Sequence, residues 1–262
     1  MSIHGAVIDV DGTVVRGTDP LPGAREGLAA LDDAGVARLF VSNNPTKAPP
    51  AYSDRLRTAG FDVAPEKVIT SGTTTVAYLR ERHPDGRVFL VGERGLRSQL
   101  TAAGLAVTDD PEAADVVVAS IDREFTYDRL SEALRALDGD DVALVGTDPD
   151  AVIPAPDRDV PGSGAILGAV AAVAERDPDA VLGKPSPTAR RLVAERLDPP
   201  PESCLVVGDR LDTDITLGER AGMETALVLT GVTDEGDLAD AEHVPDHVFD
   251  TLAGVRDLLP DG

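Results

Sequence analysis

The chain has 262 residues, of which 24 are Lys or Arg and 47 are Asp or Glu, so its formal net charge is −23. A surface this acidic repels phosphodiester backbones and anionic lipid headgroups, which argues against a nucleic-acid-binding or membrane-surface protein. Hydrophobic residues make up 42% of the chain, which is enough for a folded core and more than an acidic disordered tail contains.

Short apolar runs alternate with helical patterns along the chain. In order, the sequence predicts a strand at 6–8, a helix at 24–33 ended by Gly35, and strands at 37–41, 88–91, 115–119 and 142–145. It then predicts a helix that begins at Pro187 with Ser186 as its N-cap, followed by strands at 205–207 and 225–229. Strands of this size, separated by crossover helices, are typical of parallel sheets covered on both faces. The predicted fold class is therefore α/β.

The cysteine count and the lengths of the apolar runs indicate where in the cell the protein is located. Cys204 is the only cysteine, and its apolar surroundings indicate a small buried side chain rather than a disulfide partner or metal ligand. The N-terminus lacks the basic region of a secretory signal. The longest weakly polar run, 162–174, has thirteen residues, whereas a membrane span needs about 20. We expect a cytoplasmic protein.

The charged residues also indicate an environment. Lysine occurs only as Lys47, Lys67 and Lys184, and every other basic residue is arginine. Few lysines, many carboxylates and only 3% aromatic residues favour a proteome adapted to very high salt, such as that of a halophilic archaeon. The Debye length falls to about 3 Å at 1 M salt, so repulsion within such a surface is screened. The alternative is an ordinary acidic bacterial protein.

Polar side chains stand at the ends of three predicted strands. They are Asp9 and Asp11 with Gly12 after the first strand, Ser42, Asn43 and Asn44 after the second, and Asp209 with Asp214 after the run at 205–207. In an open parallel sheet, ligands bind outside the carboxyl ends of the strands. These distant segments therefore predict one shared site.

The residue types at these strand ends favour phosphoryl transfer. Asp9, Asp11 and Asp209 need a cation if they lie together, and an all-oxygen ligand set suits Mg²⁺. One carboxylate can attack phosphorus to give an aspartyl-phosphate, while a second protonates the leaving oxygen and then activates water. Gly12 allows a tight turn. Lys184 is the leading candidate to stabilise the phosphoryl oxygens, because its compact ammonium fits a crowded site.

Simpler interpretations exist for each segment. The two Asp residues after the first strand and the Asn43-Asn44-Pro45 sequence are common in turns, and 209–214 could be a solvated charge run. An EF-hand is excluded, since Gly12 stands at its fourth position and no glutamate stands at its twelfth. The glycines of 162–168 resemble a dinucleotide-binding fingerprint with one residue too many, which favours a phosphate-cradling or closely packed helix start.

These segments resemble the four motifs of the haloacid dehalogenase (HAD) superfamily: Asp9–Thr13, Ser42–Asn44, Lys184 and Gly208–Asp214. Further segments are similar to its subfamily IIA, the NagD-like or 4-nitrophenylphosphatase-like branch. They are Thr70–Gly72, Val91–Glu93, Asp122–Tyr127, Thr147–Asp150 and Gly183–Pro187. The resemblance covers nearly the whole chain.

The resemblance implies a Rossmann-like core with an inserted α/β cap that closes over the site. We place the core at 1–80 and 179–262 and the cap at 81–178. The spacing agrees with this division. Asp9 and Ser42 are 33 positions apart, which leaves room for a helix and a strand only, whereas 142 positions separate Ser42 from Lys184 and can hold a whole domain.

The resemblance also implies a role for each motif residue. Asp9 would be the nucleophile, and Asp11 the general acid/base, whose main-chain carbonyl also reaches Mg²⁺. Lys184 would stabilise the aspartyl-phosphate, Asp209 would ligate Mg²⁺, and Asp214 would support the metal from nearby. The phosphoryl oxygens would be held by Gly12, Ser42, Asn43 and Asn44.

Two cap residues bear on specificity. Relatives commonly carry Asn or His where this chain has Asp148, and an acidic side chain there would repel a second anionic group on the substrate. Arg123 would do the opposite. Both are expected to contact the substrate, and the simpler interpretation of each is an exposed loop charge.

The sequence thus predicts a Mg²⁺-dependent phosphatase for small phosphate monoesters, such as nucleotides, sugar or glycerol phosphates, with 4-nitrophenyl phosphate as a substrate in vitro. Within the superfamily, a haloacid dehalogenase would not need the second acid or a metal, and a mutase usually has a small helical cap between the first two motifs. The alternative from another class is a catalytically idle sensor that binds phosphometabolites. The expected macromolecular partner is a second copy of this chain, joined through the cap in a homodimer.

Overall fold

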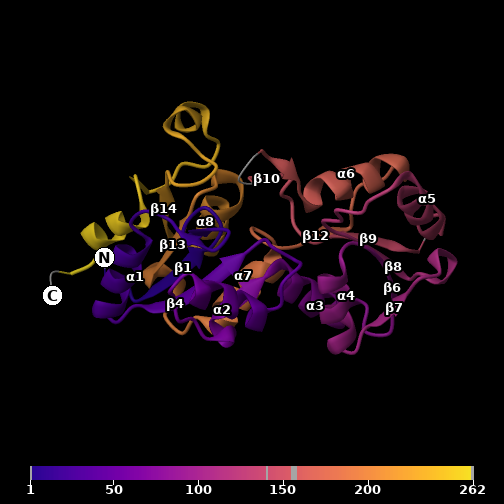
Figure 1. Ribbon diagram of the computed structural model, residues 1–262, viewed down its shortest axis with the longest axis horizontal. Coiled ribbons are helices and arrows are strands. Elements are labelled where there is room, and N and C mark those ends of the chain that lie inside the picture. Colours follow the sequence, from indigo (N-terminus) through magenta and orange to yellow (C-terminus); the bar gives the residue numbers. More distant parts are fainter. Residues whose placement is uncertain (1, 140, 155–157, 261–262) are drawn as a thin grey trace. The chain divides into compact units, whose positions relative to one another are not determined.

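The computed structural model describes residues 2–139, 141–154 and 158–260, which form two compact units (Figure 1). The first unit comprises Met1–Ser42, Pro49–Ile69 and Lys184–Gly262, and the second comprises Asn43–Ala48 and Thr70–Gly183. The predicted cap boundaries at residues 81 and 178 both fall inside the second unit. The physical reason at the first boundary is Leu79, which packs in the same apolar cluster as Leu96 and Leu100 of that unit.

The first unit contains helices on both sides of one main sheet. Its helices are α1 (Ala24–Asp33), α2 (Pro49–Thr58), α7 (Pro187–Arg196) and α8 (Thr216–Ala221). Its strands are β1 (Gly5–Asp9), β2 (Val15–Arg16), β3 (Asp19–Pro20), β4 (Ala37–Ser42), β5 (Val68–Thr70), β13 (Cys204–Gly208), β14 (Glu224–Val228) and β15 (His247–Phe249). Short helical turns occur at η1 (Pro65–Lys67), η3 (Pro201–Ser203), η4 (Leu211–Ile215), η5 (Glu235–Asp240) and η6 (Leu252–Leu258).

The sheet of the first unit has the strand order β15-β14-β13-β1-β4-β5. Strand β1 pairs in parallel with β4 on one side and with β13 on the other, so that Gly5 lies between Ala37 and Cys204. On one side of β1 the sheet continues with β4 and β5, and on the other side it continues with β13, β14 and β15. The carboxyl ends of these three strands therefore lie together at the point where the strand order reverses, which is where such sheets bind ligands.

Apolar side chains of the strands pack against the helices that cover this sheet. Ile8 of β1 belongs to the cluster that includes Leu28 of α1 and Leu56 of α2. On β13, Val206 lies against α8, where a Cβ on Gly218 would come within 3.1 Å of the valine side chain. Cys204 is fully buried, as predicted.

The predicted helix boundaries of this unit are confirmed. Helix α1 spans Ala24–Asp33, and Gly35 follows it with a left-handed φ of 68°, as a C-terminal glycine cap requires. Helix α7 begins at Pro187, and the Ser186 side chain accepts a hydrogen bond from the backbone N of Ala189.

The second unit is built around its own sheet. Its helices are α3 (Ser71–Arg82), α4 (Arg94–Ala102), α5 (Tyr127–Ala136) and α6 (Ser163–Val173), with a helical turn η2 (Pro111–Ala113). Its strands are β6 (Arg87–Val91), β7 (Ala106–Thr108), β8 (Val116–Ala119), β9 (Ala143–Gly146), β10 (Val152–Ile153), β11 (Val160–Pro161) and β12 (Ala180–Val181).

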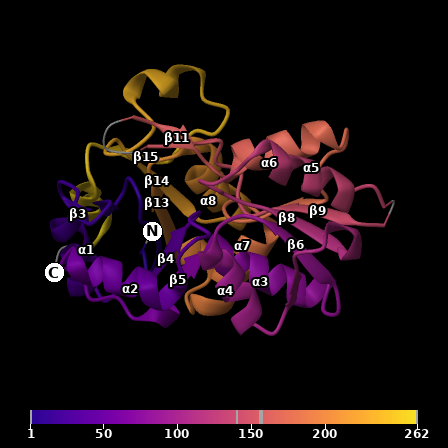
Figure 2. The ribbon, with the colours of Figure 1, turned by 45° about the vertical axis from the view of Figure 1, so that its right-hand side comes forward.

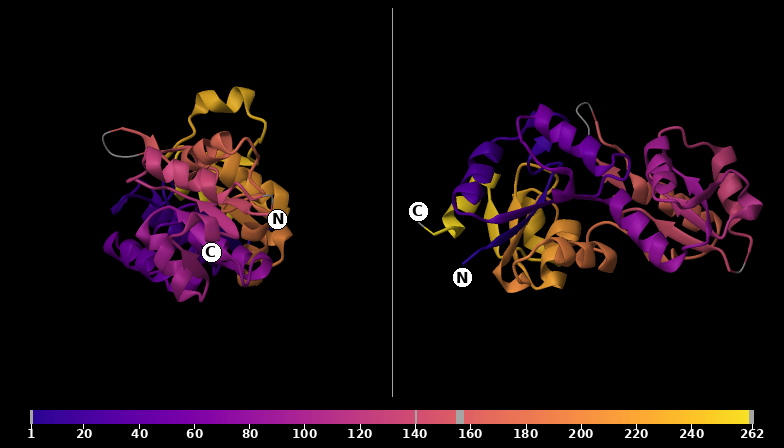
Figure 3. Two further views of the ribbon diagram at one scale, coloured as in Figure 1. Left: turned by 90° about the vertical axis from the view of Figure 1, so that its right-hand side faces the viewer. Right: turned by 90° about the horizontal axis from the view of Figure 1, so that it is seen from below.

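The second sheet has the order β12-β9-β8-β6-β7, and its neighbours pair in parallel. Phe89 of β6 packs in the cluster that contains residues of α5 and α6, whereas its neighbour Leu90 packs with residues of α3 and α4. Figure 2 shows these two helix pairs on opposite faces of the sheet, and Figure 3 gives further views of it. Both sheets are thus parallel and covered on both faces, which confirms the α/β fold class.

The glycines at the start of α6 serve close packing. A Cβ on Gly162 would lie 2.2 Å from the carbonyl oxygen of Asp150, and one on Gly164 would lie 2.3 Å from that of Pro149. Of the two interpretations of the 162–168 segment, this geometry favours the closely packed helix start. In the described part of the chain, no helix combines the length and apolar character that crossing a membrane demands.

Candidate active site

A buried ion cluster lies at the carboxyl ends of β1 and β13. Asp9 is the last residue of β1, and Asp214 lies in η4, a π-type turn just after β13. The Nζ of Lys184 is 2.5 Å from Oδ1 of Asp9 and 2.6 Å from Oδ1 of Asp214. The lysine side chain is only 3% exposed. The structure therefore brings Lys184 and these two carboxylates together at one point of the fold.

A third carboxylate, that of Asp209, completes the cluster. One carboxylate oxygen from each of Asp9, Asp209 and Asp214 lies within 4.8 Å of the other two. The Oδ2 of Asp209 accepts a hydrogen bond of 2.7 Å from the backbone N of Val232. The other oxygen, Oδ1 of Asp209, and Oδ2 of Asp9 are buried without a hydrogen-bond partner among the described residues. Two buried oxygens of the cluster therefore have no protein partner among the described residues and could bind a cation.

The charge of the cluster supports the same conclusion. Three carboxylates and one ammonium leave two negative charges if all are ionised, and a divalent cation would neutralise them. An all-oxygen set of this kind fits Mg²⁺. The residues present therefore fit the predicted metal, which Asp9 and Asp209 would hold, with Asp214 beside them.

Burial dominates the electrostatics of these groups. It raises the pKa of Asp9 well above its usual range; Lys184 opposes this rise, and the charges of Asp214 and Asp209 add to it. Burial and the charge of Asp214 raise the pKa of Asp209 to about 7. Burial disfavours the charged form of Lys184, but Asp214 and Asp9 outweigh it and raise its pKa. Without a cation these carboxylates hold protons more readily, so metal binding would release protons.

The turn after β1 requires glycine at position 12. Gly12 has a φ of 101°, and a Cβ there would lie 2.3 Å from Oδ2 of Asp209. A side chain would collide with the carboxylate cluster and strain the backbone. Gly12 therefore brings the Asp9 turn close to Asp209.

Asp11 lies outside the buried cluster. Its side chain is 44% exposed and is bound by Arg55 and Tyr52 of α2. The Nη1 of Arg55 donates to Oδ2 of Asp11 at 3.2 Å, and the hydroxyl of Ser42 lies 3.4 Å from the same oxygen. The predicted acid/base thus lies beside Ser42, the predicted phosphoryl-binding hydroxyl.

Tyr52 and Arg55 are the residues that sequence analysis missed. Burial and the nearby charge of Asp11 raise the pKa of the Tyr52 hydroxyl, so the hydroxyl keeps its proton and can donate it in a hydrogen bond. Burial opposes the charge of Arg55, but the hydrogen bonds and charge of Asp11 raise its pKa. In the sequence, Arg55 resembles any surface arginine of a polar helix, and only the spacing of three positions from an aromatic residue links it to Tyr52.

The segment after β4 divides between the two units. Ser42 ends β4, and its hydroxyl lies 2.7 Å from that of Tyr52. Asn43 begins the second unit, where its Nδ2 lies 3.4 Å from Oδ1 of Asp150. Oδ1 of Asn44 accepts a hydrogen bond of 2.9 Å from the backbone N of Thr46 and so closes a turn. Phosphoryl binding by Asn43 and Asn44 stays a prediction.

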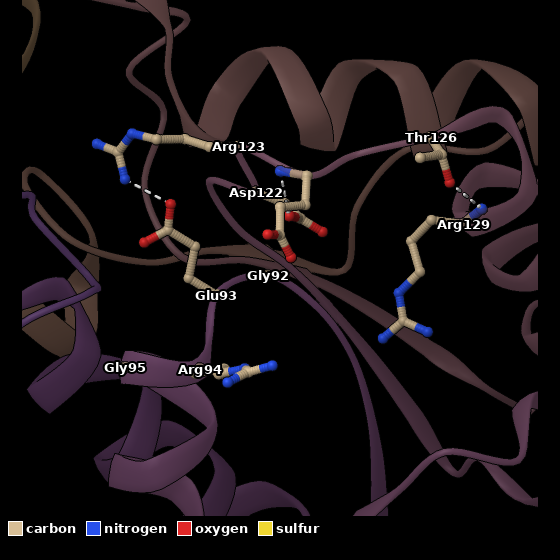
Figure 4. Close-up of a pocket in the computed structure, with 9 residues that line it drawn as sticks. Gly92, Glu93, Arg94, Gly95, Asp122, Arg123, Thr126 and Arg129 are labelled. Atoms are coloured by element: carbon tan, nitrogen blue, oxygen red, sulfur yellow. Dashed lines mark hydrogen bonds and ion pairs between the residues drawn. The ribbon is translucent and has the colours of Figure 1, made fainter.

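A pocket of about 640 Å³ opens at the carboxyl ends of β6 and β8 in the second unit (Figure 4). Arg123 lines it and pairs with Glu93, as Figure 4 shows. The strand order reverses between β6 and β8, so the pocket occupies a typical ligand position. The lining residues are Gly92, Glu93, Arg94, Gly95, Asp122, Arg123, Glu124, Thr126 and Arg129.

Asp148 is buried rather than an exposed loop charge. Its Oδ2 accepts a hydrogen bond of 3.0 Å from Thr147, and its Oδ1 accepts one of 3.3 Å from the backbone N of Asp150. Burial and the charge of Asp150 raise the pKa of Asp148 to about 8. The raised pKa favours the neutral form of this carboxyl group, which weakens the expected repulsion of a second anionic group. Direct contact with substrate stays a prediction.

Comparisons with known proteins agree with these motifs. The family model described as haloacid dehalogenase-like hydrolase matches residues 6–106, and one described as HAD-hydrolase-like matches residues 181–255. An acid sugar phosphatase of Staphylococcus epidermidis is 35% identical over 246 residues, which cover 94% of each chain.

Solved structures are equally similar. A p-nitrophenyl phosphatase from Archaeoglobus fulgidus has a TM-score of 0.90 and 34% identity, with 99% of this chain and 100% of that chain covered. NagD from E. coli K-12 has a TM-score of 0.83 and 30% identity, with 97% and 98% covered. The predicted resemblance is therefore confirmed over nearly the full length.

Proposed function

The chain belongs to the haloacid dehalogenase-like hydrolase family and is a phosphomonoesterase, and from this premise we propose that it is Mg²⁺-dependent and works through an aspartyl-phosphate. The observation that carries the proposal is the buried cluster of Asp9, Asp209 and Asp214. In that cluster Lys184 supplies one positive charge, and two carboxylate oxygens have no hydrogen-bond partner among the described residues.

Each residue of the cluster has a defined task in this reaction. Lys184 holds one oxygen of Asp9 and orients its carboxylate for attack on phosphorus. Asp9 forms a new O–P bond while the bond to the leaving oxygen breaks, and Asp11 gives that oxygen a proton. In the second step a water molecule attacks the phosphoryl group and Asp11 takes up its proton, which releases inorganic phosphate and restores Asp9.

The remaining groups stabilise charge. Mg²⁺, held by Asp9 and Asp209 with the main-chain carbonyl of Asp11, would offset the negative charge of the phosphoryl oxygens. Asp214 also binds the Nζ of Lys184, at 2.6 Å. Ser42, Asn43 and Asn44 would donate hydrogen bonds to the phosphoryl oxygens, as would the backbone of Gly12.

The proposed substrates are small phosphate monoesters, such as nucleotides and sugar or glycerol phosphates. The names of the relatives, an acid sugar phosphatase and a p-nitrophenyl phosphatase, support this class. Arg123, which lines the pocket of the second unit, stays a predicted substrate contact. The acidic surface, at −23, disfavours large polyanions.

The direct test is hydrolysis of 4-nitrophenyl phosphate at molar salt, with Mg²⁺ and with a chelator. We expect turnover that requires Mg²⁺ and falls by about 10³-fold or more in Asp9→Asn. Asp62→Asn, at a carboxylate 93% exposed, is the matched control and should keep wild-type activity. Absence of turnover, with Asp9→Asn indistinguishable from wild type, would favour the idle sensor. A panel of phosphate esters under the same conditions would then identify the substrate.

A further inference from the structure

Four polar side chains of the first unit form a connected group beside the acidic cluster. The Tyr52 hydroxyl contacts both Ser42, at 2.7 Å, and Oδ2 of Asp11. Arg55 donates to both oxygens of Asp11 and, at 3.1 Å, to the Tyr52 hydroxyl. The chain Ser42–Tyr52–Asp11–Arg55 therefore joins the predicted phosphoryl-binding hydroxyl to the predicted acid/base.

Arg55 and Tyr52 are themselves held in place. Tyr52 is fully buried, and the Arg55 side chain is only 8% exposed. The Nε of Arg55 donates to the carbonyl oxygen of Gly17 at 2.6 Å, and its guanidinium stacks over the Tyr52 ring at 5.2 Å. An arginine fixed at both its Nε and its two Nη atoms presents a rigid fork to a carboxylate.

Asp11 depends on these contacts for its orientation. It stands in the turn after β1, nearly half exposed, and its carboxylate takes no part in the cluster of Asp9, Asp209 and Asp214. Without Tyr52 and Arg55 its side chain would be free to sample several rotamers in solvent. A proton donor must lie within hydrogen-bond reach of the leaving oxygen, so loss of orientation lowers the rate of proton transfer.

We propose that Tyr52 and Arg55 are positioning residues for Asp11, which keep its carboxyl group beside Ser42, where the phosphoryl group binds. The proposal rests on the proposed function, because it assigns Asp11 the proton transfers of that reaction. In the first step the proton leaves the Asp11 carboxyl group for the departing alkoxide oxygen. In the second step a proton returns to Asp11 from the attacking water, so Tyr52 and Arg55 neither gain nor lose one.

Leaving-group dependence separates this role from a structural one. An alkoxide is a far stronger base than 4-nitrophenolate, so its departure depends much more on a proton from Asp11. A general defect of folding or phosphoryl binding would lower turnover of both esters alike. A defect in the orientation of Asp11 would slow departure of the alkyl leaving group selectively, whereas the later hydrolysis step is common to both esters.

The experiment compares kcat/KM, which covers only the steps up to departure of the leaving group, for an alkyl phosphate, glycerol phosphate, and for 4-nitrophenyl phosphate in Tyr52→Phe and Arg55→Gln. We expect the alkyl ester to lose about 10-fold or more and the nitrophenyl ester less than about 3-fold. Arg55→Lys keeps the charge but not the fork, so its loss should be intermediate. Arg57→Gln on the exposed side of α2 and Tyr78→Phe in the second unit are matched controls.

The outcomes are distinct. Equal losses on the two esters, or a gain on the alkyl ester, would overturn the positioning role while leaving the phosphatase assignment intact. A wild-type protein that hydrolyses neither ester would overturn the proposed function and this proposal with it. Thermal unfolding of each variant shows whether it is folded, and the milder Arg55→Lys keeps the comparison decisive if Arg55→Gln does not fold.

Discussion

Asp148 offers a test of how burial sets charge in the second unit. Its carboxyl group is buried beside Asp150, and its pKa is raised from 3.8 to about 8. Replacing it by asparagine, Asp148→Asn, keeps the shape of the side chain and removes the titration. The variant therefore isolates the effect of this one proton on stability.

The sign of the effect follows from the raised pKa. The folded protein holds the Asp148 proton more tightly than the unfolded chain, so its stabilising contribution is complete below pH 3.8. That contribution declines as the pH rises and is lost above about pH 8. The slope is at most about 1.4 kcal/mol per pH unit, which amounts to roughly 3 kcal/mol between about pH 5 and 7.5.

Scanning calorimetry of the whole chain at several pH values would measure this change. For a chain of this size about 1 kcal/mol corresponds to roughly 2–4 °C, so the Tm of Asp148→Asn relative to wild type should rise by roughly 6–12 °C over that interval. Asp177→Asn, at an exposed carboxylate of the same unit, should show no such trend.

A Tm difference that does not change with pH would refute the reasoning, because it would mean that Asp148 titrates near its ordinary pKa. The same variant bears on specificity. If Asp148 is mostly neutral below pH 7, its replacement should leave the preference between substrates with one and two anionic groups unchanged there. A strong gain for doubly anionic substrates at pH 6 would show instead that an ionised Asp148 repels them.

Four further outcomes are expected. Lys184→Met leaves three buried carboxylates without their cation, so without Mg²⁺ stability should fall by about 3–5 kcal/mol in denaturant titrations; wild-type stability would contradict this. Asp209→Asn removes an unpartnered oxygen, so the rise of Tm with added Mg²⁺ should shrink, and an unchanged rise would contradict the metal assignment. Gly12→Ala places a Cβ 2.3 Å from Asp209, and calorimetry should show a loss of about 1–3 kcal/mol; wild-type stability would count against the tight turn. Activity should be highest near molar salt, as a salt titration can check, and an optimum near zero added salt would contradict adaptation of the acidic surface.

The strands could be predicted because parallel strands buried on both faces leave continuous apolar runs. Those of β1, β4, β6, β8, β9, β13 and β14 are all found within two residues of their predicted bounds. The short strands β12 and β15 were not predicted, because Ala180–Val181 and His247–Phe249 are too brief to show a pattern. The unit boundary at residue 70 was missed for a different reason, since α3 begins directly after β5.

The part of the site that lies at the ends of strands could be predicted from the sequence. Asp9 and Asp209 follow apolar strands of a parallel sheet, so topology alone brings them together. The contacts of Asp11 depend on where α2 packs, and no local pattern reports that Tyr52 and Arg55 are buried. An acidic residue in a loop, such as Asp148, is expected to be exposed, and only the packing of its unit reveals the opposite.

The distribution of lysines has a practical consequence for labelling. Lys184 is 3% exposed inside the carboxylate cluster, whereas Lys47 and Lys67 are exposed. Lys47 lies in the second unit and Lys67 in the first. An amine-reactive dye would therefore modify one lysine side chain in each unit and spare the one in the buried cluster. With Cys204 buried as well, the natural chain carries one accessible lysine attachment point in each unit, so a dye on each would report separately on that unit.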